Sequence, residues 1–522
     1  MRGLTLQLVF ALKAAFFLYV LGGCAGCTPS PSVDSPQQPM NQPRLVLVYA
    51  PCTVNKSYLS PYNSDVTYTP QLDAFARSAV VFEKHRTEAG LSGIAYASIF
   101  TGHQASEHGV FAHPTTLSDS LYDITEAFTD NGYDTYFWNH QRMGAADLNY
   151  GQGVPAANVF KRMLNAEDHR LGQILQRLTT DKDYRACLVV NHRVNHNPYQ
   201  ARHLATFLQQ YPAEGEILHR ISQEDFRKYM NLYYTHDFML RYDFEQVSKE
   251  QNLSDQDIQN LAEVVELLYK SNIPVLDQLF GSVLAKIDEY GLKEDSLIAF
   301  TADHGESMFR SHASFKWSHG HALQSDVLDV PLIIRIPDSD VASRRIAHVS
   351  RSIDLFPTLS TLANLEMPDD LILGGYDFAD AVRGQQLAPR LLAFSHTGMV
   401  MPNTDKRYEL QESLGRYLAR FYPAVDMEHT WVAVRDGDMV WKYRPRDNQT
   451  FEFQAFDVQA DPGEANNIFD DQIPMHQEHA KKLTAYKEIL VTAYREWLAS
   501  PPAEQLGTEE RLDRLRGLGY IK

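Results

Sequence analysis

Cysteine is scarce in this chain, at four residues in 522. One of the four, Cys24, lies at a candidate processing site near the N-terminus, and the three other thiols do not make a framework of disulfides. Hydrophobic residues form 44% of the sequence, which is enough for a sizeable core. The fold is therefore expected to rest on its core, as two or more domains or one large domain with an appendage.

The chain also lacks an excess of positive charge. Its formal net charge is −18 and its pI is near 5.5. Binding to nucleic acid depends on Lys and Arg side chains that neutralise phosphates, and this charge balance opposes it. Nucleic acid is therefore excluded as the main partner.

Long apolar segments are absent apart from residues 4–21, which follow Arg2. A basic start, an apolar stretch and small residues ahead of a cysteine are typical of a secretory signal peptide. Residues 21–24 (Leu-Gly-Gly-Cys) also resemble a bacterial lipobox, in which the cysteine becomes the lipidated first residue. We therefore predict that residues 1–23 are removed and that Cys24 anchors an exported protein to a bacterial membrane, with Ala25 favouring the outer membrane. An uncleaved membrane anchor is the alternative.

Composition divides the rest of the chain into three parts. Residues 24–43 are rich in Pro and Ser and are predicted to form a flexible tether. Residues 44–399 are predicted to form an α/β domain that includes a helical layer at residues 200–290. Residues 400–522 are predicted to form a smaller α+β subdomain, because they contain a hairpin pattern around an Asp-Gly turn followed by a segment of helical periodicity.

Short apolar runs recur along the α/β domain, at residues 45–50, 186–190, 296–300 and, more weakly, 330–334. Each run is typical of a buried parallel strand. Helical stretches such as residues 69–78 and 121–131 lie between them. This alternation predicts a doubly wound, mostly parallel sheet flanked by helices. Because ligands bind at the carboxyl ends of the strands in such sheets, the residues directly after each run are candidates for chemistry.

Polar side chains follow two of these runs. Asp303 and His304 come directly after residues 296–300, and a carboxylate beside an imidazole suits a divalent cation. His192 and His196 follow residues 186–190. They could contact a phosphate- or sulfate-like group or a second metal, and one of them could equally be structural.

Two further clusters carry chemistry. Lys316 and His319 lie within six residues that also include His321, and such groups could neutralise an oxyanion and protonate a leaving group. Ser92 lies between Gly90 and Gly93 at the start of a predicted helix. It is a candidate nucleophile, helped by the positive end of the helix, and on local sequence alone also a helix cap.

In this order, the clusters resemble the sulfatase branch of the alkaline phosphatase superfamily. The likeness covers nearly everything after residue 44 and includes residues 68–76, 97–102, 303–306, 353–358 and 456–467. The resemblance implies a metal-assisted hydrolase whose partner is a sulfated or phosphorylated small molecule or glycan. It places Ser92 at the nucleophile, Asp303 and His304 at the metal, and His196, Lys316 and His319 where the family contacts the sulfate or assists the leaving group.

The sequence departs from the family pattern at two places. The family's Cys/Ser-x-Pro-x-Arg motif lacks its Pro and Arg after Ser92, which argues against conversion of Ser92 to formylglycine. Cys52 stands where the family's first strand ends in a metal-binding aspartate. The resemblance implies one divalent cation, Ca²⁺, whereas a thiolate at Cys52 with Asp303 and His304 favours Zn²⁺. The alternative is that Cys52 is a small buried residue and the metal is lost.

The sequence is also compatible with two other functions. The missing carboxylate and arginine also fit a non-catalytic relative that binds a sulfated glycan or another anion, which metal analysis would test. Residues 188–199 are faintly similar to phosphoethanolamine transferases, which would leave a modified acceptor rather than free phosphate or sulfate.

Overall fold

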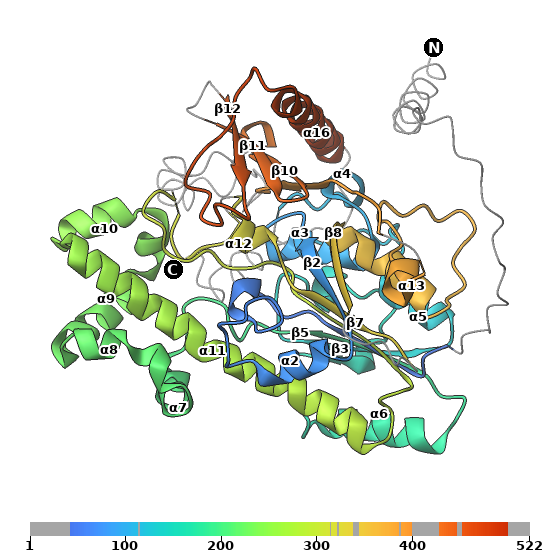
Figure 1. The fold of residues 1–522 in the computed structure, drawn as a ribbon. Helices are drawn as coiled ribbons and strands as arrows, with labels where there is room; N and C mark the ends of the chain where they lie inside the picture. The colour runs from blue at the N-terminus through green and yellow to red at the C-terminus, as the bar shows by residue number, and fades with distance from the viewer. Residues whose placement is uncertain are drawn as a thin grey trace, which may run out of the picture. The chain divides into compact units, whose positions relative to one another are not determined.

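The computed structural model describes residues 42–112, 115–313, 315–320, 323–337, 344–385, 388–398, 427–445 and 451–499 (Figure 1). The predicted signal peptide, the lipid-carrying Cys24 and nearly all of the predicted tether lie outside these ranges, as does the predicted subdomain boundary near residue 400. Within the described ranges, no helix combines the length and apolarity needed to cross a bilayer.

An eight-stranded sheet forms the centre of the protein, in the order β4-β3-β5-β1-β6-β7-β2-β8. The strands are β4 (Val159–Phe160), β3 (Asp134–Asn139), β5 (Ala186–Asn191), β1 (Leu45–Tyr49), β6 (Ser296–Thr301), β7 (Leu332–Arg335), β2 (Val80–Arg86) and β8 (Arg344–Arg351). The predicted runs at residues 45–50, 186–190 and 296–300 are the three adjacent strands β1, β5 and β6. They pair in parallel, so their carboxyl ends meet at one edge.

The prediction of a parallel strand at residues 330–334 is wrong in direction. β7 pairs antiparallel with both β6 and β2. A parallel strand needs a crossover that returns the chain to the opposite edge. Residues 302–331 carry only the four-residue helix α12 (Ser325–Leu328) among the parts that the structure describes. The chain therefore stays at the edge where β6 ends, and β7 starts from there.

The sheet has a separate apolar core on each face. Along β1, Val46 and Val48 belong to one core, and Leu45, Leu47 and Tyr49 belong to the other. This alternation follows from the two-residue period of a strand. Burial on both faces explains why the run is continuously apolar.

Helices cover both faces (Figure 1). One core includes apolar residues of α3 (Ser92–Thr101), α5 (Ile124–Asp130), α13 (Leu355–Leu362), α14 (Ala379–Arg383) and α16 (Pro474–Ala499). The other includes those of α2 (Pro70–Ala76), α6 (His169–Thr180), α7 (Leu204–Gln210), α8 (Ile217–Arg220), α9 (Gln223–Tyr242), α10 (Phe244–Glu250) and α11 (Asp255–Glu289). The short helix α4 (Ala105–His108) follows α3. The helical layer predicted at residues 200–290 corresponds to α7 to α11.

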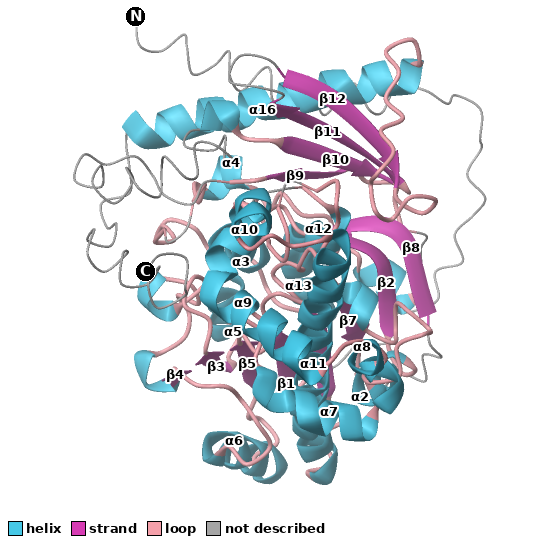
Figure 2. Ribbon diagram, turned by 90° about the vertical axis from the view of Figure 1, so that its left-hand side faces the viewer, coloured by secondary structure: helices cyan, strands magenta, loops and turns pink. Residues whose placement is uncertain are grey.

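A second, antiparallel sheet has the order β12-β11-β10-β9 (Figure 2). Its strands are β9 (Ala393–His396), β10 (Val432–Asp436), β11 (Met439–Pro445) and β12 (Phe451–Asp457). The predicted hairpin is β10–β11, and Gly437 takes a positive φ of 61° at its turn, a conformation that glycine adopts without steric cost. The helix α16 packs on this sheet. The observed fold is thus the predicted α/β sheet with a smaller antiparallel sheet near the C-terminus.

Candidate active site

Four of the predicted site residues meet at the carboxyl edge of the central strands. Cys52 follows β1, Asp303 and His304 follow β6, and Ser92 is the first residue of α3. All four are at most 3% exposed. Backbone hydrogen bonds tie the loops together, since the Cys52 N–H donates to the His192 carbonyl oxygen at 2.7 Å.

Ser92 points its hydroxyl into this cluster and does not cap α3, so the local alternative of a helix cap is wrong. The N-cap residue is Leu91, one position earlier. Ser92 Oγ lies 3.2 Å from His304 Nε2 and 3.5 Å from Cys52 Sγ. Gly90 makes this turn possible, because a Cβ at that position would come within 2.6 Å of the Gly320 nitrogen. The nucleophile candidate therefore sits at the positive end of a ten-residue helix.

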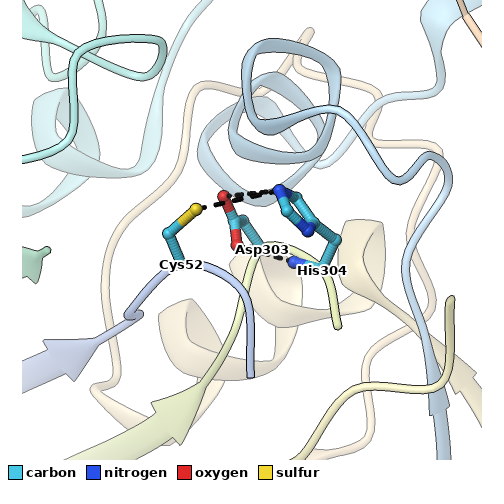
Figure 3. A group of neighbouring side chains, drawn as sticks. All are labelled: Cys52, Asp303 and His304. Carbon is cyan, nitrogen blue, oxygen red and sulfur yellow. Dashed lines mark hydrogen bonds and ion pairs between the residues drawn. The ribbon is translucent and has the colours of Figure 1, made fainter. Parts of the chain in front are cut away.

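Cys52, Asp303 and His304 form a possible metal site (Figure 3). Their ligand atoms lie within 4.8 Å of one another. His304 Nδ1 lies 2.9 Å from the Gly305 carbonyl oxygen and donates its proton there, which leaves a lone pair on Nε2. That lone pair faces Cys52 Sγ at 3.7 Å and Asp303 Oδ2 at 3.6 Å.

The Asp303 carboxylate is only half satisfied. Its Oδ1 accepts from the Thr53 N–H at 3.2 Å and the His304 N–H at 2.7 Å. Its Oδ2 is buried and has no hydrogen-bond partner among the described residues. Buried polar atoms are nearly always paired, so an unpaired carboxylate oxygen facing a sulfur and an imidazole lone pair fits a bound cation. One carboxylate, one thiol and one imidazole suit Zn²⁺ better than Ca²⁺, which takes six to eight oxygens.

The charge state of Cys52 depends on whether a cation is bound. Burial, followed by the nearby Asp303 carboxylate, raises the pKa of the Cys52 thiol well above its usual range. A coordinating cation would lower the pKa of this thiol, because it deprotonates the thiol that binds it. The residues present thus fit a thiolate-binding divalent cation.

His319 and His196 extend the cluster beyond His304. The His319 ring stacks on that of His304 with centroids 4.4 Å apart, and the His196 ring meets His319 edge-on at 5.0 Å. His319 Nδ1 bonds Glu306 Oε1 at 3.0 Å. Burial raises the pKa of the Glu306 carboxyl well above its usual range, with Arg241 opposing the shift. The His319–Glu306 pair can therefore retain a proton beside the cluster.

His196 is a neutral, oriented imidazole. Its Nδ1 bonds the Asn197 carbonyl oxygen at 2.6 Å, and burial together with Arg193 lowers its pKa well below the usual value. His192, the other histidine of this loop, bonds the Tyr49 hydroxyl at 3.0 Å. His192 thus braces β1 against β5, and His196 is the one that joins the cluster.

Lys316 is not part of this cluster in the structure. Its ammonium group donates to the carbonyl oxygens of Arg310 at 2.7 Å and Ser311 at 3.2 Å, and also to that of Ala313. Burial lowers the pKa of Lys316 to about 8. The observed contacts hold the loop that follows Phe309, so Lys316 stabilises a loop beside the site.

Two residues that the sequence analysis did not select belong to the site. Gln141 follows β3, is 1% exposed, and contacts both Cys52 and Ser92. Glu306 lies inside the Asp-His-Gly-Glu segment but was given no role of its own. The strand β3 was not among the predicted runs, and recognising it would have drawn attention to the residues after it.

Comparison with known proteins agrees with the geometry. The Sulfatase family model matches residues 53–365, which is more than half of the chain. The protein therefore belongs to the sulfatase family, as the order of its motifs predicted.

Two curated relatives match over limited segments. Steryl-sulfatase of Mus musculus is 32% identical over 126 residues, covering 22% of this chain and 20% of its own length. N-acetylglucosamine-6-O-sulfatase of Bacteroides thetaiotaomicron is 23% identical over 239 residues, covering 45% of this chain and 37% of its own. These matches thus span only about a fifth to two fifths of the relatives.

Solved structures match the fold over most of the chain. One, in complex with its substrate D-glucosamine-2-N,6-O-disulfate, has a TM-score of 0.60 at 17% identity and covers 89% of this chain and 100% of its own. A phosphonate monoester hydrolase of Agrobacterium radiobacter has a TM-score of 0.55 at 16% identity and covers 87% and 96%. At such identities the likeness establishes the fold alone.

Proposed function

We propose that the protein hydrolyses sulfate or phosphate esters, with Ser92 as the nucleophile. The observation that carries this proposal is the convergence of Ser92 Oγ with Cys52, Asp303 and His304 at one sheet edge, with Ser92 Oγ 3.2 Å from His304 Nε2. A hydroxyl at a helix N-terminus, beside three side chains that could hold a cation, has the surroundings that activate a nucleophile.

The surrounding residues have distinct roles in this proposal. Asp303 and His304 fix the position of the cation site beside Ser92, because hydrogen bonds to backbone groups hold both side chains in place. His319, paired with Glu306, supplies the proton that a departing alkoxide needs. His196 contacts the transferring anion as a neutral hydrogen-bonding group.

We further propose that Cys52, Asp303 and His304 hold one Zn²⁺. Such an ion would act as a Lewis acid toward the anion's oxygens. Elemental analysis of the purified protein should find close to one zinc per chain, and Cys52→Ser should lose most of it. Retention of calcium in preference to zinc would contradict the assignment, whereas no metal in any preparation would favour the non-catalytic relative.

Substrate identity is proposed only by chemical class. Several relatives are named for the sulfate esters they act on, including the ulvan-active sulfatase of Formosa agariphila, which is 22% identical over 329 residues. We infer that the substrate here is a sulfated or phosphorylated small molecule or glycan.

A panel of esters tests the activity. Purified protein with zinc would be incubated with 4-nitrophenyl sulfate, 4-nitrophenyl phosphate and a phosphonate monoester, and free sulfate or phosphate would be measured by ion chromatography. Ser92→Ala should lower turnover by at least about 10³-fold, while Ser120→Ala, at an exposed loop serine, should leave it unchanged. Equal turnover by wild type and Ser92→Ala would refute the nucleophile. A modified acceptor without free anion would identify a transferase.

We also propose that the protein is exported and lipid-anchored through Cys24, with residues 24–43 as a tether, residues 44–399 as the catalytic domain and residues 400–522 as a C-terminal subdomain. The lipobox-like residues 21–24 support the anchor. Cells grown with labelled palmitate should label the wild-type chain and Cys27→Ala but not Cys24→Ala. Labelling of Cys24→Ala would contradict the anchor.

A further inference from the structure

Gln141 makes contact with both the nucleophile candidate and the cysteine of the possible metal site. Its Nε2 lies 3.0 Å from Cys52 Sγ and 3.0 Å from Ser92 Oγ. Gln141 is 1% exposed, so these contacts are made without competition from bulk water. A carboxamide has two N–H donors on one nitrogen, which is the number of acceptors that it meets here.

The orientation of this amide is fixed by its oxygen. Gln141 Oε1 accepts from the Arg142 N–H at 2.5 Å and from the Met143 N–H at 3.3 Å. With the oxygen engaged by two backbone donors, the NH₂ group must face the cluster. The amide therefore cannot rotate by 180° without losing bonds on both sides.

The loop that carries Gln141 is itself fixed against the sheet. The Gln141 N–H donates to Asn191 Oδ1 at 3.2 Å, and Asn139 Nδ2 donates to the Gln141 carbonyl oxygen at 2.8 Å. Gly144 lets the same loop pack on α3, because a Cβ there would come within 2.3 Å of the Tyr96 ring. The end of β3, the end of β5 and the start of α3 thus hold Gln141 together.

The direction of these bonds determines how the nucleophile is presented. Because Gln141 Nε2 can only donate, Ser92 Oγ and Cys52 Sγ both act as acceptors toward it. In the metal-free chain the Ser92 proton is then directed to another acceptor, and His304 Nε2 lies 3.2 Å away. In the metal-free chain, one oxygen lone pair of Ser92 is occupied by Gln141 and its O–H is aimed at His304, which fixes the rotation of the hydroxyl.

We propose that Gln141 is a positioning residue, which holds Ser92 Oγ and Cys52 Sγ as acceptors in register with Asp303 and His304. The kinetic part of this inference rests on the proposed function, whereas the metal-binding part does not. Partners that orient metal ligands in this way typically change metal affinity or activity by about 10- to 100-fold when replaced.

The variant Gln141→Met tests donation separately from shape, because methionine is close to glutamine in volume, has no NH₂ donor and adds no charge that could itself bind the cation. Zinc affinity, measured by competition with a fluorescent chelator, should fall about 10- to 100-fold, and kcat should fall by a similar factor with KM changed less than about twofold. Gln141→Ala should lower both at least as much. Gln152→Met is the matched control, since Gln152 Nε2 donates to the Ser118 carbonyl oxygen in a loop away from the cluster.

A third readout reports on the contact itself. The alkylation rate of Cys52 by iodoacetamide in zinc-free protein should change in Gln141→Met, while that of Cys187, buried in β5, should not. If wild-type protein turns over none of the esters but Gln141→Met still weakens zinc binding, the proposed function fails and the positioning role stands. Zinc affinity, kcat and Cys52 alkylation all within twofold of wild type in Gln141→Met would overturn the inference.

Discussion

Two buried polar clusters of this protein treat their carboxylates in opposite ways. In the first, at the carboxyl edge of the central strands, Asp303 leaves Oδ2 without a hydrogen-bond partner among the described residues. In the second, Asp329 follows α12 and uses both oxygens, accepting from Arg86 at 2.7 Å and from Arg435. Burial would raise the pKa of Asp329, but Arg435 and Arg86 bring it well below its usual range.

This difference indicates different roles: Asp329 stabilises the fold, whereas Asp303 belongs to the candidate active site. Arg86 lies in β2 of the central sheet and Arg435 in β10 of the small sheet, so Asp329 joins the two sheets through a paired ion cluster. Both oxygens of the Asp329 carboxylate are paired with arginines, so its charge is balanced within the folded chain itself. The buried Asp303 carboxylate, with an unpaired oxygen beside a thiol and an imidazole lone pair, instead has the surroundings of a cation ligand.

The largest effect expected on stability comes from breaking the scaffold cluster. Asp329→Ala leaves two buried arginines without their carboxylate, and removal of one partner from a buried ion pair typically costs about 3 to 5 kcal/mol. The urea midpoint of the variant should fall accordingly. Asp134→Ala, which removes a half-exposed partner of Arg177, should cost less than about 1 kcal/mol. Equal losses in the two variants would contradict the distinction between the clusters.

At the candidate active site, His319→Gln is expected to act on the chemistry of leaving-group departure. Loss of a general acid typically lowers turnover by about 10² to 10⁴-fold. The loss should be large for alkyl esters, whose alkoxides need a proton to leave, and small for 4-nitrophenyl esters, whose phenolate leaves without one. kcat would be measured for both kinds of ester in parallel.

The control for this prediction is His312→Gln, since His312 is exposed and bonds the Gly463 carbonyl oxygen. It should leave both rates unchanged. If His319→Gln lowered both classes of ester by the same factor, His319 would act by holding the site rather than by donating a proton.

The sequence was sufficient for the strands that carry most of the site. Runs buried on both faces, such as residues 45–50 and 296–300, are continuously apolar, and that pattern is visible without any tertiary information. The direction of β7 was not predictable in this way. An apolar run reports burial, whereas direction depends on whether the intervening residues 302–331 return to the opposite edge.

For the site, the sequence supplied the residues but not their partners. Cys52, Ser92, Asp303 and His304 follow strands or begin a helix, so the topology brings them together. Gln141 was missed because an amide has no chemistry of its own that a motif would reveal. Its part in the site depends on a distance of 3.0 Å to two residues that lie far away in the chain.

A third buried carboxylate, that of Asp277, is paired with backbone N–H groups rather than with side chains. Asp277 of α11 accepts from the Leu72 N–H at 2.8 Å and the Gln71 N–H at 3.0 Å, and so caps α2. Thr69, ahead of α2, uses its hydroxyl on the Ser60 N–H instead. Asp277→Ala should therefore cost about 1 to 2 kcal/mol, as loss of a cap does.

This prediction carries a dependence on pH. Burial raises the pKa of Asp277 to about 6. A group whose pKa is raised by folding adds stability at low pH and loses it as pH rises through the folded value. The difference in unfolding free energy between wild type and Asp277→Ala should thus be larger at pH 5 than at pH 7.5. Asp288→Ala, at an exposed site of the same helix, should show neither the cost nor the pH dependence.

The smallest effect on the metal-free fold is expected at the site itself. In Asp303→Asn, the amide oxygen can still accept from the Thr53 and His304 N–H groups, and the amide nitrogen can donate to His304 Nε2, which lies 3.6 Å from Asp303 Oδ2. A buried charge with an unpaired oxygen is thereby replaced by a neutral, better-paired group. With chelator present, the variant should unfold within about 1 kcal/mol of wild type or be the more stable.

Added zinc should stabilise wild type more than Asp303→Asn. A ligand that binds only the folded state raises stability by about 2.7 kcal/mol at a concentration 100 times its dissociation constant. Thermal unfolding with added zinc should therefore shift wild type upward and leave Asp303→Asn almost unmoved. An equal shift in both would remove Asp303 from the metal site, whereas a loss of 3 kcal/mol or more in chelator would place Asp303 beside Asp329 as part of the scaffold.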